Sequence, residues 1–158
     1  MSGTDTALDL TLSRVVPLPR AILWRGWTEP AQLVKWFTPK PWRTTACEID
    51  LRPGGHFRTT MSPPDGPAHS SEGCYLEVVP DRRLVWTSAL TAGYRPAVDS
   101  PMPMTVFLTL DDHAEGTLYQ ARVLHRDAEG CRQHAAMGFE AGWGAALDQL
   151  IGIADQLR

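Results

Sequence analysis

Two carboxylates are the residues of this sequence whose type and position could carry out chemistry. Glu77 lies in the alternating segment SEGCYLEVV, and Glu140 lies three residues before Trp143 on the apolar stripe of a C-terminal helix. A carboxyl group that faces an apolar cavity has a raised pKa and can act as a general acid or base. The simpler interpretation is solvent exposure or an ion pair, for example between Glu77 and Arg58 or Arg122.

A second set of residues could line a pocket for an apolar or aromatic ligand. Strand alternation places Phe57 with Met61 on one face, Tyr75 with Glu77 on another, and Trp86 on the same kind of face in the next strand. Tyrosine and tryptophan rings offer an apolar body and one polar group to a ligand. The same rings could instead fill a closed core. The candidate ligand-binding residues are Trp36, Phe57, Met61, Tyr75, Glu77, Trp86, Phe107, Phe139, Glu140 and Trp143.

Two of these candidates need a further remark. Phe107 lies in TVFLTL, which is apolar on both faces, so the direction of its ring stays open. Trp36 ends a short helix, where the chain turns back and could border a cavity opening. Trp24 and Trp27, by contrast, share one face of the preceding helix, and we expect them to be structural.

Familiar catalytic and metal-binding motifs are absent from the sequence. PGG (53–55) lacks the Lys-Ser/Thr of a phosphate loop, and neither a Cys-x-x-Cys nor a Gly-x-Ser-x-Gly motif occurs. The five histidines are scattered, with no pair on one helical face. We therefore expect no catalytic residue, no metal and no cofactor.

Composition limits the partners and the compartment. The chain has 158 residues, a formal net charge of -3 and 43% hydrophobic residues, which suits one globular domain. No Lys/Arg block indicates nucleic-acid binding, no apolar run is long enough to span a membrane, and the start does not resemble a secretory signal. Three separated cysteines (Cys47, Cys74 and Cys131) argue against a disulfide framework and predict a cytoplasmic protein.

The elements that must position the candidate residues follow from periodicity and turn residues. A strand over 8–16 precedes two short helices within 19–37, and an amphipathic helix covers 129–157. Between them, alternation predicts strands over 44–52, 56–62, 71–79, 84–90, 104–112 and 117–125, with a loop over 91–103. Gly138 and Gly142 weaken the first half of the last helix, which predicts loose packing there.

This order of elements resembles the START-like, helix-grip superfamily. Within it, the chain is similar to the family named after the activator of heat-shock protein 90 ATPase. The resemblance rests on PLPRAILWRGWTEPAQLVKWF, DLRPGGHFRTTM, GCYLEVVPDRRLVWT, GTLYQARVLH and GWGAALDQL, in this order. It implies an α+β fold in which a curved antiparallel sheet of about seven strands wraps around a long C-terminal helix, with two short helices after the first strand. One domain over 1–158, with a core of about 8–157, is expected.

What the resemblance implies about function is a cavity between the sheet and the C-terminal helix. The superfamily includes lipid carriers, hormone receptors, aromatic polyketide cyclases and chaperone-activating domains. Our first hypothesis is a domain that binds a hydrophobic or aromatic small molecule. The alternatives are a module that activates a chaperone ATPase and a cyclase- or hydrolase-type enzyme that uses the same cavity. Missing nucleophile and metal motifs weigh against the enzyme, and the lack of a further chaperone-binding domain weighs against the chaperone role. A monomer or homodimer is expected.

Overall fold

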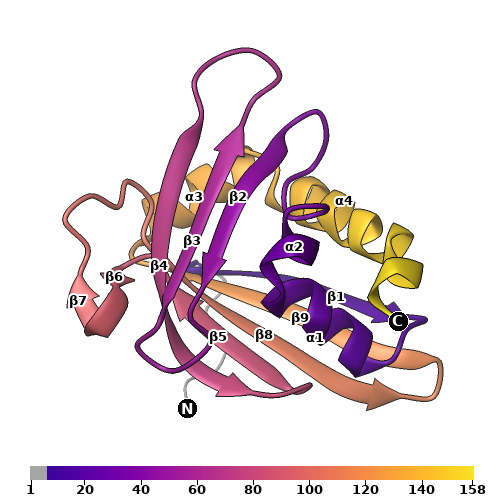
Figure 1. The fold of residues 1–158 in the computed structure, drawn as a ribbon. Helices are drawn as coiled ribbons and strands as arrows, with labels where there is room; N and C mark the ends of the chain where they lie inside the picture. Colours follow the sequence, from indigo (N-terminus) through magenta and orange to yellow (C-terminus); the bar gives the residue numbers. More distant parts are fainter. Residues whose placement is uncertain (1–6) are drawn as a thin grey trace.

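Seven antiparallel strands form one curved sheet in the computed structural model of the protein, which describes residues 7–158 (Figure 1). The strands lie in the order β1-β9-β8-β5-β4-β3-β2. Their bounds are β1 Asp9–Val16, β2 Arg43–Ile49, β3 His56–Ser62, β4 His69–Val79, β5 Arg83–Thr87, β8 Met104–His113 and β9 Gly116–His125. The predicted curved antiparallel sheet is confirmed, because apolar alternation along these segments buries one face of each strand.

Two short helices follow the first strand, as predicted. They are α1 (Arg20–Thr28) and α2 (Pro30–Leu33), and Pro30 occupies the first turn of α2. Leu23 and Trp27 of α1 are buried, as is Leu33 of α2. These helices close one end of the curved sheet (Figure 1).

The C-terminal segment forms two helices rather than the single one predicted over 129–157. They are α3 (Ala128–Ala136) and α4 (Phe139–Gly152), and a short 3-10 helix, η2 (Ala154–Leu157), follows them. The break lies at Gly138, whose φ of 92° belongs to the left-handed region that glycine tolerates. The break separates the histidine-bearing α3 from α4, so each helix can pack at its own angle on the sheet.

A small finger interrupts the segment that the sequence predicts as a loop. It consists of β6 (Leu90–Thr91), the 3-10 turn η1 (Ala92–Tyr94) and β7 (Arg95–Pro96). Two-residue strands carry too little alternation to be recognised in a sequence. The finger projects from the side of β4 that lies away from α1 and α2 (Figure 1).

The core lies between the inner face of the sheet and the helices. From Val106 to Leu110 on β8 and along β9, every second side chain is buried, as Leu108 and Ala121 are. Leu147 and Leu150 of α4 cover this face. None of the helices in residues 7–158 has the length and apolar character that a membrane span requires.

Candidate ligand-binding site

Three aromatic side chains from neighbouring strands gather on the inner face of the sheet. Phe57 of β3 stacks on Tyr75 of β4 with ring centres 5.5 Å apart, and meets Trp86 of β5 edge-on at 4.9 Å. Tyr75 and Trp86 are directly opposite each other in the strand register. A side chain on Gly73 would meet Trp86 Cε3 at 3.5 Å, so the glycine leaves room for the indole to lie across β4. Alternation predicted this shared face.

The segment after α1 extends this aromatic surface. Phe37 contacts Phe57 edge-on at 5.7 Å and Trp36 at 5.6 Å, and Trp36 in turn contacts Trp27 at 5.1 Å. Trp36 is buried, so it forms part of the interior rather than the rim of an opening. Edge-on geometry between rings is favourable and holds their relative orientation. The α1–α2 segment therefore fixes one wall of the aromatic interior.

The helices contribute a second aromatic group. Phe139 and Trp143 of α4 contact each other at 5.1 Å, and His134 of α3 meets Phe139 edge-on at 5.2 Å. Phe139 is buried and Trp143 is half-buried. The two groups of rings come from opposite sides of the interior, one from the sheet and the other from α3 and α4.

Two polar atoms on the sheet side of this interior are buried without a hydrogen-bond partner. They are the Tyr75 hydroxyl oxygen and Trp86 Nε1, in side chains that are 0% and 6% exposed. Other buried rings are paired, because Trp27 Nε1 donates to the Tyr119 hydroxyl at 3.1 Å and Trp36 Nε1 donates to the Gly26 carbonyl at 3.0 Å. An unpaired buried donor costs about 1–3 kcal/mol. The fold therefore supplies no hydrogen-bond partner for the Tyr75 hydroxyl or for the Trp86 indole N–H.

The groups around this pair are electrically neutral. Burial, and secondarily the charge of Glu48, raise the pKa of the Cys47 thiol on β2 to about 11. Burial also raises the pKa of Tyr75 well above its usual value, with a smaller contribution from Cys47. Neither group ionises at neutral pH. This part of the interior can therefore offer hydrogen bonds but no charge.

Two buried tyrosines make a matched test of the unpaired hydroxyl. Tyr119→Phe should lower the free energy of unfolding by about 1–3 kcal/mol, because it leaves the Trp27 indole N–H without its acceptor. Tyr75→Phe should raise it by about 1 kcal/mol, because it removes a buried group that has no partner. Urea denaturation of the wild type and of both variants measures whether the free energy of unfolding falls or rises. An equal loss in both variants would mean that the Tyr75 hydroxyl is satisfied within the fold.

The structure places two candidate residues on the outer face instead. A register shift between Tyr75 and Glu77 turns Glu77 away from the interior, and Glu77 forms an ion pair with Arg83. Phe107 pairs with Val85 in the register and therefore also points outward. The prediction for Glu77 assumed an uninterrupted alternation in β4. The direction of Phe107 stays open in the sequence, because its segment is apolar on both faces. Glu77 does form an ion pair, but with an arginine other than the two expected.

Two further candidates lie at the margin of the interior. Glu140 is exposed in the first turn of α4, where a carboxylate interacts favourably with the helix dipole. Met61 of β3 is half-buried, at the end of the strand that carries Phe57. Since neither Glu77 nor Glu140 faces an apolar cavity, the condition for acid–base chemistry at these residues is not met.

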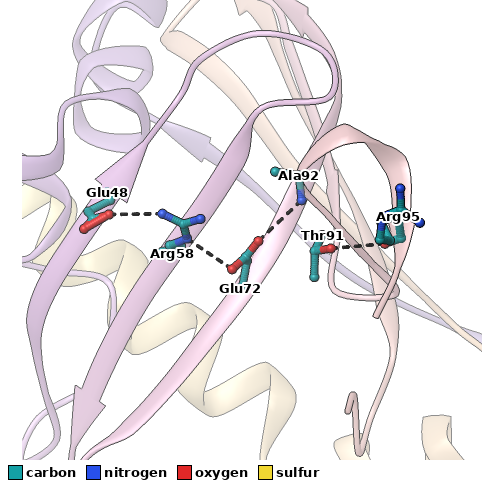
Figure 2. A network of polar contacts seen from close by, with 6 residues as sticks. All are labelled: Glu48, Arg58, Glu72, Thr91, Ala92 and Arg95. Carbon is teal, nitrogen blue, oxygen red and sulfur yellow. Dashed lines mark hydrogen bonds and ion pairs between the residues drawn. The ribbon is translucent and has the colours of Figure 1, made fainter. Parts of the chain in front are cut away.

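The outer face of β2–β4 carries an ion-pair network. Arg58 bonds Glu48 at 3.3 Å and Glu72 at 3.1 Å, and Glu72 accepts from the backbone N–H of Ala92 at 3.4 Å (Figure 2). Arg58 and the backbone contact with Ala92 lower the pKa of Glu72. Figure 2 shows that this network ties the β6–β7 finger to the sheet. Arg58, Glu48 and Glu72 are therefore paired with one another on the outer face.

Sequence reasoning missed a buried histidine pair. His125 Nδ1 lies 2.8 Å from the Leu8 carbonyl, and His125 Nε2 lies 2.9 Å from His134 Nδ1. With both rings neutral, His125 donates to Leu8 and accepts from His134. Burial, and secondarily the proximity of His125, lower the pKa of His134 to about 4. The two histidines are nine residues apart and lie on β9 and α3, and this spacing does not indicate a contact in the sequence.

A surface hollow lies elsewhere on the described part of the chain. It has a volume of about 560 Å³ and is lined by both apolar and polar residues between the end of β1 and the β8–β9 turn, including Leu18, Arg20 and Asp112. Arg20 is already bonded to Asp112 at 2.8 Å and to the Asp81 carbonyl at 2.8 Å. The hollow therefore presents a cation that already forms an ion pair and two hydrogen bonds within the fold.

Open space lies beside two of the glycines at the start of α4, where the sequence predicts loose packing. A side chain on Gly138 or Gly144 would meet nothing within 4 Å, and one on Gly142 would meet Pro39 Cγ at 3.9 Å. The second half is fixed more tightly, since Gln149 donates to the carbonyls of Trp36 and Thr38. The half that carries Trp143 is held by the buried Phe139 ring and by Arg14, which donates to the Gly144 carbonyl at 3.4 Å.

Comparisons with known proteins agree on one family. The model of the family described as activator of Hsp90 ATPase homolog 1-like protein matches residues 17–155. A crystal structure of a protein from Nitrosomonas europaea is 44% identical over 97% of each chain, with a TM-score of 0.92. A Mycobacterium smegmatis protein is 26% identical over 93% of this chain and 90% of that one, with a TM-score of 0.77.

A further solved structure is similar to this chain in its fold alone. An AHSA1-like protein from Aeromonas hydrophila is 18% identical over 94% of this chain and 93% of that one, with a TM-score of 0.69. No curated protein sequence matches the chain.

Proposed function

Since the chain belongs to the activator of Hsp90 ATPase homolog 1-like family, we propose that it binds an apolar or aromatic small molecule between the inner face of its sheet and helices α3 and α4. The proposal rests chiefly on the buried Tyr75 hydroxyl and Trp86 indole N–H, which have no partner within the fold. A stable core satisfies such groups, whereas a binding site keeps them for its ligand.

The surroundings of these donors support the same proposal. The aromatic rings from the sheet and from α4 supply the apolar lining that small-molecule sites use. Trp143 is only half-buried, and open space lies beside the neighbouring Gly144, so we place the entry of the ligand at this half of α4. The two carboxylates that would have supported an enzyme lie outside this interior, so binding without chemistry is the function we propose.

A neutral fluorescent dye tests the proposal. Nile red should bind saturably with micromolar affinity and increase its fluorescence, because it leaves water for an apolar interior. Phe57→Leu, on the inner face, should weaken binding about threefold to tenfold by removing an aromatic contact. Fluorescence titration of the wild type and the variants measures both effects.

A variant on the outer face is the matched control. Phe107→Leu makes the same change of side chain on the opposite side of the sheet, where Phe107 packs between the guanidinium groups of Arg83 and Arg122. It should leave dye affinity unchanged. The proposal fails if Nile red does not bind saturably, or if Phe107→Leu weakens binding as much as Phe57→Leu.

A further inference from the structure

Arg122 is a cation that the fold leaves without a counter-ion. Its side chain is half-buried on the outer face of β9, and its Nε atom is buried with no hydrogen-bond partner. Every other Lys or Arg side chain of residues 7–158 either forms an ion pair or is exposed to solvent. A half-buried charge without a partner is costly, so Arg122 favours any arrangement that brings a carboxylate to it.

The neighbouring groups on the outer face do not supply that carboxylate. The guanidinium carbon of Arg122 lies 5.3 Å from the ring centre of Phe107, and that of Arg83 lies at the same distance from this ring. Arg83 is paired with Glu77. On the other side of Arg122, the opposite residue in the β1–β9 register is the uncharged Thr11. Two cations therefore share one ring, and the structure gives a carboxylate to Arg83 alone.

A carboxylate without a partner lies on the same face of the sheet. Asp111 of β8 is exposed, and its side chain forms no hydrogen bond or ion pair with any residue that the structure describes. In the β8–β9 register Thr109 is opposite Gln120, with Asp111 two residues further along β8 and Arg122 two residues further along β9. Because the strands are antiparallel, the two charges lie on opposite sides of this central pair. They are about 14 Å apart along the strands, too far to meet within one chain.

This placement of the two charges is self-complementary. Consider a second copy turned by 180° about an axis that lies between the two sheets and passes over the central pair. It places the partner's Asp111 over Arg122 and the partner's Arg122 over Asp111. Half-buried apolar side chains flank both charges, since Phe107 is opposite Arg122 and Leu118 is opposite Asp111 in the register. The helices pack on the inner face and leave this side uncovered (Figure 1).

We propose that the outer face of β8 and β9 is a homodimer interface in which Arg122 of each copy pairs with Asp111 of the other. A second copy fits this face better than a nucleic acid or an anionic membrane, because the formal net charge of -3 repels polyanions. The outward curvature of the sheet limits the contact area, so the dimer is weak. The interface lies on the opposite side of the sheet from the proposed ligand interior and does not depend on the proposed function.

Sedimentation velocity of the full chain over a concentration series tests this interface. The wild type should dimerise with a Kd on the order of 10–100 μM at low salt, and more weakly at high salt. Arg122→Glu and Asp111→Arg should each weaken dimerisation roughly a hundredfold or more, because both symmetric pairs become repulsive. An equimolar mixture of these two variants should restore it, because each variant supplies the charge that the other lacks.

Arg43→Glu is the matched control. It makes the same change of charge at an exposed position of β2, which is four strands away from β8 in the sheet, and should leave dimerisation unchanged. Circular dichroism checks that the variants are folded, and the exposed Asp111→Arg decides alone if Arg122→Glu does not fold. A wild type that stays monomeric over the whole series would overturn the proposal. So would a dimer that Asp111→Arg leaves intact, or two folded variants that stay monomeric when mixed.

Discussion

Replacing Trp27 with alanine should lower the free energy of unfolding by about 3–5 kcal/mol. Trp27 is 1% exposed and contacts the rings of Trp36 and Phe37. The substitution leaves a large cavity and also removes the hydrogen-bond partner of the Tyr119 hydroxyl. Because Trp27 supports the rings that reach Phe57, the loss extends to the wall of the candidate site. Urea denaturation followed by circular dichroism measures the change.

Trp42 provides the matched control for this prediction. Its side chain is 38% exposed and stacks on His69 with ring centres 6.2 Å apart. Trp42→Ala should therefore cost no more than about 1 kcal/mol. If both alanine variants lose the same stability, Trp27 does not have the structural role described above.

Acidification should destabilise the protein through His134. Its pKa is lowered from about 6.5 to about 4 in the folded state, so the unfolded chain takes up the proton first as the pH falls. The contribution of a neutral His134 is fully present above pH 6.5 and is lost between pH 6.5 and about 4. A shift of this size corresponds to a loss on the order of 3 kcal/mol. Urea denaturation midpoints measured between pH 6.5 and 4 show how steeply stability falls with pH.

Two histidine variants separate the contribution of His134 to the pH dependence of stability from that of the carboxylates. His134→Gln should flatten the pH dependence of stability between pH 6.5 and 4, because the group with the lowered pKa is gone. His113→Gln, at the exposed last residue of β8, should follow the wild-type curve. A His134→Gln curve parallel to the wild type would show that the buried histidine pair does not control acid stability.

The fold could be predicted from the sequence wherever one periodicity persists. Alternation in β8 and β9 and the proline-bounded helices after β1 are such stretches, and the family resemblance joins them into one sheet. Gly138 shows where this reasoning stops. A glycine inside an amphipathic pattern can be tolerated within a helix or can end it, and the periodicity does not distinguish the two. In the structure Gly138 adopts the left-handed conformation and begins a new helix.

The candidate site was predictable in part for the same reason. Alternation placed Phe57, Tyr75 and Trp86 on one face, and the structure brings their rings into contact. It failed at Glu77, because the register shift after Tyr75 reverses the facing of the residues that follow.

The unpaired donors could not have been recognised in the sequence. Trp27, Trp36 and Trp86 are chemically identical, and only their three-dimensional neighbours determine that the first two donate and the third does not. The same holds for Tyr75 and Tyr119. The distinction that carries the proposed function thus exists only in the folded chain.

The most direct test of binding at Tyr75 and Trp86 is the indole N–H resonance of Trp86, followed by nitrogen-15 NMR during a Nile red titration. We expect this resonance to move downfield saturably as its proton gains an acceptor, and to be absent from Trp86→Phe spectra. The resonances of Trp27 and Trp36 should move much less, because both indoles already donate hydrogen bonds within the fold. A Trp86 resonance that stays in place at saturating Nile red, while that of the exposed Trp42 moves, would contradict binding between the sheet and the helices.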